Sequence, residues 1–272
     1  MSDSPIAVKF TGMTKRFVTA DGGTYTAVQD VDLEVPRARF VAVVGPTGCG
    51  KSTLLNTAAG LMSPSSGTVH IDGELLTGIN NRAAYMFQQD ALLPWRSVLD
   101  NVTLGLRVRG VAAAEREHLG REWLERVGLG TFASAYPHQL SGGMRKRVAV
   151  AQTWIVDPDF FFMDEPFSSL DVQTRQLMED ELLRLWTGSG KTVLFVTHDL
   201  DEAISLSDEV VLLSAGPASS IVGTYRIDLP RPRDIIDIRT SPEFIDIYRR
   251  IWSDLRSEVM KSYEQRAEAV HA

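Results

Sequence analysis

Short apolar runs alternate with longer, more polar stretches along most of the chain. Phe160–Met163 and Val193–Val196 are strand-length runs without a charged residue, and a stretch of helical character spans Val172–Trp186 between them. Buried strands that alternate with helices are typical of an α/β fold with a largely parallel sheet. The pattern therefore predicts an α/β core of this kind.

The amino-terminal part of the chain follows a different pattern. Three strand-like segments occur there: Val8–Phe10, Ala27–Val35 and Phe40–Val44. A turn of Asp21, Gly22 and Gly23 lies between the first and the second. Val69–Ile71, followed by Asp72 and Gly73, has the pattern of a further hairpin. These segments predict a small antiparallel sheet that packs on the main core.

Residues 98–155 have a mainly helical pattern, interrupted at Gly128–Gly130 and at Tyr136 and Pro137, which predicts a helical insert between two parts of the core.

After residue 217 we expect a strand pair, a basic turn at residues 231–233 and a last helix, for which Ser241 supplies the N-cap. The apolar positions of this helix fall on one face, which indicates docking on its own domain, with binding to a partner as the alternative: Phe244, Ile247, Tyr248, Ile251, Trp252 and Leu255.

Composition narrows the class of protein. The net charge of −7 argues against a general nucleic-acid binder, which is usually basic on at least one face. No apolar run reaches the roughly 18 residues of a membrane-spanning helix, and the polar residues 1–5 predict neither a signal peptide nor a transit peptide. The single cysteine, Cys49, permits no internal disulfide, as expected in a reducing cytoplasm.

A phosphate-binding motif follows the strand-like Phe40–Val44. The pattern G-x-x-x-x-G-K-[ST] and the next residue are matched in full by Gly45, Pro46, Thr47, Gly48, Cys49, Gly50, Lys51, Ser52 and Thr53. The glycines allow backbone N–H groups to turn toward phosphate oxygens, and the following helix N-terminus favours an anion. Lys51 would reach the β- and γ-phosphates of ATP, and the Ser52 hydroxyl would bind Mg²⁺. The helix dipole also predicts a thiolate at Cys49.

Two acids end the buried strand Phe160–Met163. The carboxyl end of a parallel strand lies where nucleotides bind in this class of fold. Asp164 can therefore hold Mg²⁺ through its water shell, and Glu165 can act as general base on the attacking water. In isolation, two such acids would more often begin a solvated helix; the phosphate-binding motif upstream favours the catalytic interpretation.

Further motifs resemble those of the ABC ATPases. Residues 140–144, Leu-Ser-Gly-Gly-Met, resemble the family's signature, which implies that Ser141, Gly142 and Gly143 contact the γ-phosphate held by a second subunit. Ser141 can cap the helix through Val150, and the glycine N–H groups suit an anion. The family usually has Gln where this chain has Met144, a departure that leaves the backbone anion site intact.

The remaining motifs follow the family's order. The resemblance implies that Gln88 lies near Mg²⁺ and the attacking water, that Asp171 contacts the other subunit, that His198 binds the γ-phosphate and that Phe17 stacks on adenine. It implies an ATPase that uses ATP and Mg²⁺, built on a P-loop NTPase core with an antiparallel β-subdomain. The corresponding cassette would span residues 1–229, with its helical subdomain at about residues 88–155 and a basic turn and amphipathic helix at residues 230–272.

Two segments, Leu92–Trp95 and Leu229–Arg233, resemble the corresponding segments of importer ATPases for nitrate, sulfonate, taurine and related small organic anions. This resemblance implies a head-to-tail cassette dimer, separate transmembrane permease subunits contacted near Trp95, an external solute-binding protein, and a position at the cytoplasmic face of the membrane. Gln152–Trp154 stands where Arg-Ala-Leu is typical, which weakens the subfamily assignment. The alternatives are the ATPase of a lipid or drug transporter and a soluble ABC ATPase; the single cassette without a heptad array argues against the latter.

Overall fold

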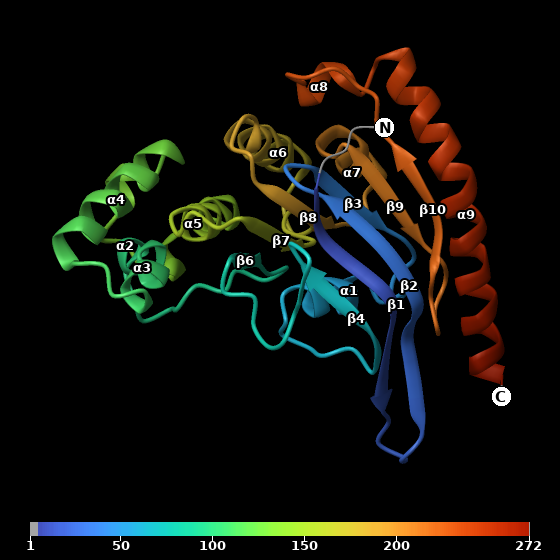
Figure 1. Cartoon of the computed structure of the whole chain (residues 1–272). Helices are drawn as coiled ribbons and strands as arrows, with labels where there is room; N and C mark the ends of the chain where they lie inside the picture. The colour runs from blue at the N-terminus through green and yellow to red at the C-terminus, as the bar shows by residue number, and fades with distance from the viewer. Residues whose placement is uncertain (1–4, 272) are drawn as a thin grey trace.

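The protein contains two β-sheets packed together and a helical arm that projects from them (Figure 1). A computed structural model describes residues 5–271, so residues 1–4, on which the expectation about targeting peptides mainly rests, lie outside the described residues. The smaller sheet is antiparallel, in the order β2-β1-β4-β5: β1 Ile6–Val18, β2 Thr24–Pro36, β4 Ser66–Ile71 and β5 Glu74–Leu75. This confirms the predicted amino-terminal sheet.

The larger sheet has the order β10-β9-β3-β8-β7-β6: β3 Phe40–Val44, β6 Ala83–Met86, β7 Phe160–Asp164, β8 Thr192–Val196, β9 Glu209–Leu213 and β10 Ile221–Arg226. Its strands pair in parallel, except that β10 is antiparallel to β9. The assignment of Phe40–Val44 to the antiparallel sheet was wrong: β3 is a central parallel strand, with every side chain buried. The strand pair expected after residue 217 is a single strand, β10, whose partner is β9.

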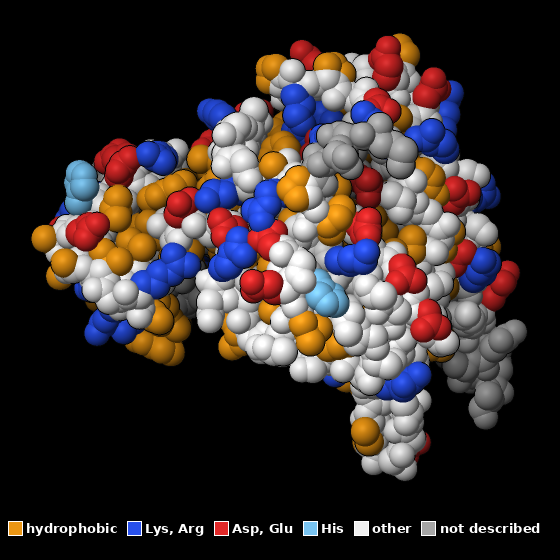
Figure 2. Space-filling view, viewed as in Figure 1, with side chains coloured by type: hydrophobic (Ala, Val, Ile, Leu, Met, Phe, Trp, Pro, Cys, Tyr) orange, Lys and Arg blue, Asp and Glu red, His pale blue; other side chains and the backbone are white. Residues whose placement is uncertain are grey.

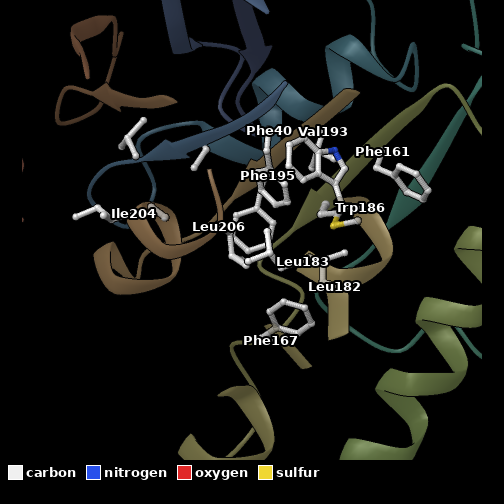
Figure 3. Close-up of a cluster of buried hydrophobic side chains, with 14 of the residues drawn as sticks. Phe40, Phe161, Phe167, Leu182, Leu183, Trp186, Val193, Phe195, Ile204 and Leu206 are labelled. Carbon is white, nitrogen blue, oxygen red and sulfur yellow. The ribbon is translucent and has the colours of Figure 1, made fainter. Parts of the chain in front are cut away.

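Helices and the smaller sheet cover the two faces of the larger sheet. One face packs against α6 (Val172–Trp186), α7 (Leu200–Leu206) and α9 (Pro242–His271). In this core the Phe40 ring lies 5.5 Å from Trp186 and 5.6 Å from Phe195, measured between ring centroids (Figure 3). The other face packs against α1 (Lys51–Ala58) and the antiparallel sheet.

The helical arm has a small core of its own. It consists of four helices and two 3-10 turns: α2 Val98–Val102, α3 Leu104–Val108, α4 Ala113–Arg126, α5 Gly142–Trp154, and turns at Gly130–Phe132 and Pro137–Gln139. This confirms the predicted helical insert. Hydrophobic side chains gather on the surface of the arm at the left of Figure 2.

The carboxy-terminal helix α9 follows the short α8 (Ile235–Ile238) and packs on the main core. Phe244, Ile251 and Leu255 are buried, as expected from their common face. Trp252 differs from that expectation and is exposed, because the residue after Ile251 lies about 100° further around the helix. Among residues 5–271, no helix is both long and apolar enough to cross a membrane.

Candidate active site

The carboxyl ends of four neighbouring strands, β3, β8, β7 and β6, meet at one edge of the larger sheet. A cavity of about 480 Å³ opens there. It is lined by six predicted residues from the phosphate loop and α1, namely Thr47, Gly48, Gly50, Lys51, Ser52 and Thr53. Four other predicted residues, Phe17, Gln88, Glu165 and His198, complete the lining together with Tyr25 and Ala27. Open α/β sheets bind ligands at this edge, so the cavity is the candidate active site.

The phosphate loop joins β3 to α1 in a conformation that requires glycine. Gly50 has a φ of +94°, and a Cβ built there would lie 2.5 Å from Val28 Cγ1. Lys51 is buried at the start of α1, and its Nζ donates to the carbonyl oxygens of Gly45 (2.9 Å) and Pro46 (3.1 Å). The loop therefore holds the Lys51 ammonium group beside the cavity, where its positive charge would attract phosphate groups.

Ser52 and Asp164 are the residues that could hold a magnesium ion. Ser52 Oγ donates to Asp164 Oδ1 at 2.9 Å, and the Tyr85 hydroxyl donates to Asp164 Oδ2 at 3.4 Å. Burial raises the pKa of Asp164, and the hydrogen bond from Ser52 opposes this effect. Burial makes the charged form of such a carboxylate unfavourable, and a nearby cation stabilises that charged form. One carboxylate and one hydroxyl, with phosphate oxygens and water, fit the usual magnesium site of nucleotide-binding proteins.

Glu165 points its carboxylate toward two other predicted site residues, Gln88 and His198. Its Oε2 accepts a hydrogen bond from Gln88 Nε2 at 3.2 Å and lies 3.1 Å from His198 Nδ1. Its φ is +42°, a conformation that is uncommon outside glycine, and its N–H donates to the Val196 carbonyl at 2.8 Å. Strained backbone of this kind is concentrated at functional sites. Gln88 contacts Glu165, and no hydrogen bond joins it to Ser52 or Asp164 in the described part of the chain.

Polar contacts fix the loop that carries His198. Thr197 Oγ1 donates to Glu202 Oε2 at 2.6 Å, and the Asp199 carboxylate accepts from the first N–H groups of α7. Arg175 of α6 reaches the same carboxylate, with Nη1 at 3.0 Å from Oδ2. These contacts position His198 at the end of β8, although none of them was predicted from the sequence.

The far end of the cavity contains two aromatic side chains. Phe17 of β1 lies opposite Tyr25 of β2 in the antiparallel register, and both line the cavity. The Lys15 ammonium is 5.4 Å from the centroid of the Phe17 ring. Tyr25 and Tyr85 were not identified from the sequence, because strand register and cross-strand neighbours cannot be derived from either residue's local pattern.

The signature residues lie outside this cavity. Ser141 caps α5, its Oγ accepting from the Met144 N–H at 3.3 Å, and Gly142 and Gly143 form the first turn. Asp171 caps α6 by accepting from the Thr174 N–H at 3.0 Å. Neither N-cap lines the cavity of its own chain.

The signature helix is nevertheless tied to the segment around Gln88. Lys146 of α5 is buried, and its Nζ donates to the Gln88 carbonyl at 2.7 Å and lies 3.1 Å from Asp90 Oδ1. Arg145 Nε also binds Asp90, at 3.1 Å from Oδ2. The arm is therefore in direct polar contact with the loop that carries Gln88.

The expectation of a thiolate at Cys49 was wrong. Its side chain is buried in the core beneath the phosphate loop, and burial raises the pKa of the thiol. The nearby Lys51 charge acts in the opposite direction but is the smaller effect. Cys49 does not line the cavity, and its backbone N–H donates to the Pro46 carbonyl oxygen at 3.3 Å.

Known proteins match most of the chain. Residues 28–168 match the ABC transporter family. The chain is 46% identical to an ABC transporter ATP-binding protein of Methanocaldococcus jannaschii, with 94% of each chain covered. It is 41% identical to the taurine import ATP-binding protein TauB of Pseudomonas aeruginosa, over 90% of this chain and 91% of the relative. It is 39% identical to the nitrate import ATP-binding protein NrtC of Synechococcus elongatus, over 87% of this chain and 36% of the relative.

Solved structures show the same fold. A dimeric ATP-binding cassette in a post-hydrolysis state, bound to ADP and phosphate, matches with a TM-score of 0.73 at 30% identity. The match covers 82% of this chain and 100% of that cassette. Sequence and fold agree with the motifs that surround the cavity, and the chain therefore belongs to the ABC transporter family, as an ATP-binding cassette.

Proposed function

We propose that this chain is the ATP-hydrolysing subunit of an ABC importer for a small anion of the nitrate, sulfonate or taurine type. One observation carries the enzymatic part of the proposal: Glu165 Oε2 lies 3.2 Å from Gln88 Nε2 and 3.1 Å from His198 Nδ1, in the cavity that also contains Lys51 and Ser52. A base and two polar groups thus converge beside a phosphate loop.

Each residue has a role that its position supports. Lys51 and the loop N–H groups would bind the β- and γ-phosphates of ATP, and His198 would contact the γ-phosphate. Gln88 would orient the attacking water, and Glu165 Oε2 would accept its proton. Mg²⁺ held by Ser52 and Asp164 would neutralise negative charge on the phosphates. The rate enhancement would come from positioning and charge stabilisation, as in other phosphoryl transfers.

The site requires a second copy of the chain to be complete. Ser141, Gly142 and Gly143 present a helix N-terminus, which suits an anion, but they lie away from the cavity of their own chain. In a head-to-tail pair the signature of each copy would close on the γ-phosphate bound by the other, and Asp171 would contact the opposite copy. The dimeric state of the related solved cassette supports this arrangement.

Transport would be powered through separate membrane subunits. Trp95 is 72% exposed in the loop that follows Gln88, and it is a large apolar side chain that a permease could bury. The names of the taurine and nitrate import relatives support import of a small anion. The chain would then work at the cytoplasmic face of the membrane with a permease and an external solute-binding protein, and closing of the pair would drive the permease.

Trapping of an ATP-bound dimer tests the proposed head-to-tail pair. A Glu165→Gln protein retains the size and hydrogen-bonding shape of the side chain but cannot act as the base, so ATP-bound dimers should accumulate in size-exclusion chromatography. Adding Ser141→Arg should abolish the trapped dimer, because a bulky side chain would keep the signature from the opposite phosphate. A dimer that survives Ser141→Arg would contradict the head-to-tail arrangement.

A further inference from the structure

Helix α9 exposes a face that the core does not use. We define the α9 stripe as Trp252, Arg256, Met260 and Tyr263, whose spacings of four, four and three residues place them on one side of the helix. Trp252, Met260 and Tyr263 are 43%, 52% and 65% exposed. The inner face of α9 is already buried against the larger sheet. The helix is thus anchored on one side and presents large apolar side chains on another.

The α9 stripe borders the candidate active site. Trp252 and Tyr263 line a cavity of about 220 Å³ together with Gly45, Pro46 and His198. In the pair described under the proposed function, the second copy covers the phosphate loop. That copy would therefore arrive beside the α9 stripe, which continues the surface at which the two cassettes meet.

Basic side chains lie within the stripe and beside it. Arg249 and Arg256 line a shallow cavity of about 630 Å³ with Trp252, and Lys261 and Glu264 contribute the other charges there. Lys261 is engaged by Glu258, at 2.6 Å between Nζ and Oε1. The remaining charges leave this surface positive, so it would be complementary to an acidic partner surface.

An acidic and apolar groove lies on the same chain between α6 and α8, which are neighbours in Figure 1. Leu177 and Ile236 are 61% and 63% exposed there, and Asp180 and Asp234 flank them around a cavity of about 330 Å³. Arg184 of the same helix contacts Asp180 at 3.3 Å, but both side chains of this pair are exposed, where such a pair contributes little. The helix α6 begins directly after Asp171, the residue expected to reach the opposite copy. One side of the groove is therefore formed by α6, the helix that begins at the expected contact of Asp171 with the opposite copy.

We propose that the α9 stripe of each copy docks in the α6–α8 groove of a second copy of this chain when ATP closes the pair. The apolar side chains of the stripe lie against Leu177 and Ile236, and Arg256 faces Asp180. A twofold pair makes this contact twice, because each copy supplies one stripe and one groove. The proposal rests on the head-to-tail pair and adds a contact area away from the phosphates, built largely from a helix outside the residues matched to the family.

Cross-linking tests the contact directly. Met260→Cys and Leu177→Cys are introduced together in the Glu165→Gln chain, in which the one native cysteine, Cys49, is buried. With ATP and a short bismaleimide, a covalent dimer should form that is absent without ATP. Leu177→Cys paired with Val108→Cys, on the exposed surface of the arm, is the control and should give no dimer. A covalent dimer from Met260→Cys alone would place two α9 helices together and overturn the proposal.

Dissociation constants of the ATP-bound pair, measured by analytical ultracentrifugation, provide the second test. Trp252→Ala should weaken the pair about tenfold, as expected for a buried interface tryptophan. Phe132→Ala, which truncates an aromatic of similar exposure on the arm, should leave the constant unchanged. Arg256→Glu and Asp180→Arg should each weaken the pair roughly fivefold, and the double variant should restore it.

The outcomes separate the two proposals. If ATP forms the pair but neither Trp252→Ala nor the charge reversals change its constant, the α9 contact is wrong and the head-to-tail pair stands. If ATP forms no pair at all, the head-to-tail arrangement fails, and the α9 contact fails with it.

Discussion

Replacement of Gly50 by alanine tests whether the phosphate loop depends on the conformation described above. Gly50 has a φ of +94°, and the new Cβ would lie 2.5 Å from Val28 Cγ1 and 3.2 Å from the Ala27 carbonyl oxygen. A left-handed conformation costs about 1–2 kcal/mol for other residues, and overlap in a packed region typically adds about 1–3 kcal/mol. We expect Gly50→Ala to lower the free energy of unfolding by about 2–5 kcal/mol. ATP binding should be lost, because α1 begins at the next residue and would shift.

Gly78→Ala is the matched control. Gly78 has nearly the same φ, +92°, but its Cβ would meet nothing within 4 Å. This variant should lose only about 1–2 kcal/mol and should bind ATP normally. Urea unfolding followed by circular dichroism gives the free energies, and titration calorimetry gives ATP binding. If Gly50→Ala matched Gly78→Ala in stability and bound ATP, the argument for a glycine-dependent loop would be refuted.

Three further predictions concern Glu179, Cys49 and Trp95. Burial raises the pKa of Glu179 to about 7 from 4.5 despite the Arg239 guanidinium at 2.6 Å. The folded state therefore binds the proton more tightly, so the free energy of unfolding should fall by about 3 kcal/mol from pH 4.5 to 7; Glu179→Gln should remove this slope in urea titrations. Alkylation of Cys49 should be slow with and without ATP, and fast modification of the folded protein would contradict its burial. Trp95→Ala should preserve ATP binding but lower transport per ATP hydrolysed in the reconstituted complex; an unchanged ratio would exclude a permease contact there.

Much of the fold could be predicted because it depends on local patterns. The helix Val172–Trp186 has the expected bounds, and the buried run Phe160–Met163 forms β7 together with Asp164. The position of Phe40–Val44 could not be derived in this way. A fully apolar segment of five residues has no alternation to show which sheet it joins, and only its pairing with β8 and β9 decides the matter.

The site could be predicted to the extent that its residues belong to recognisable sequence motifs. Residues that follow strand ends, such as Glu165 and His198, reach one cavity because parallel strands bring their carboxyl ends to the same edge. Tyr25 and Lys146 enter the site region through strand register and through packing of the arm, which local sequence does not encode. The same limit explains Cys49, because the helix dipole is a local effect whereas burial of the thiol depends on the surrounding core.

The central claim is that Glu165 is the general base of an ATPase, and the hydrolysis rate of Glu165→Gln tests it most directly. ATP binding is measured in the same samples, so that a loss of rate can be assigned to chemistry. Loss of a general base typically lowers the rate about 10²–10⁴-fold, which is roughly 3–5 kcal/mol in activation free energy. We predict a fall of this size with ATP affinity equal to or above that of the unmodified chain. A Glu165→Gln protein that hydrolyses ATP at close to the unmodified rate would contradict the account.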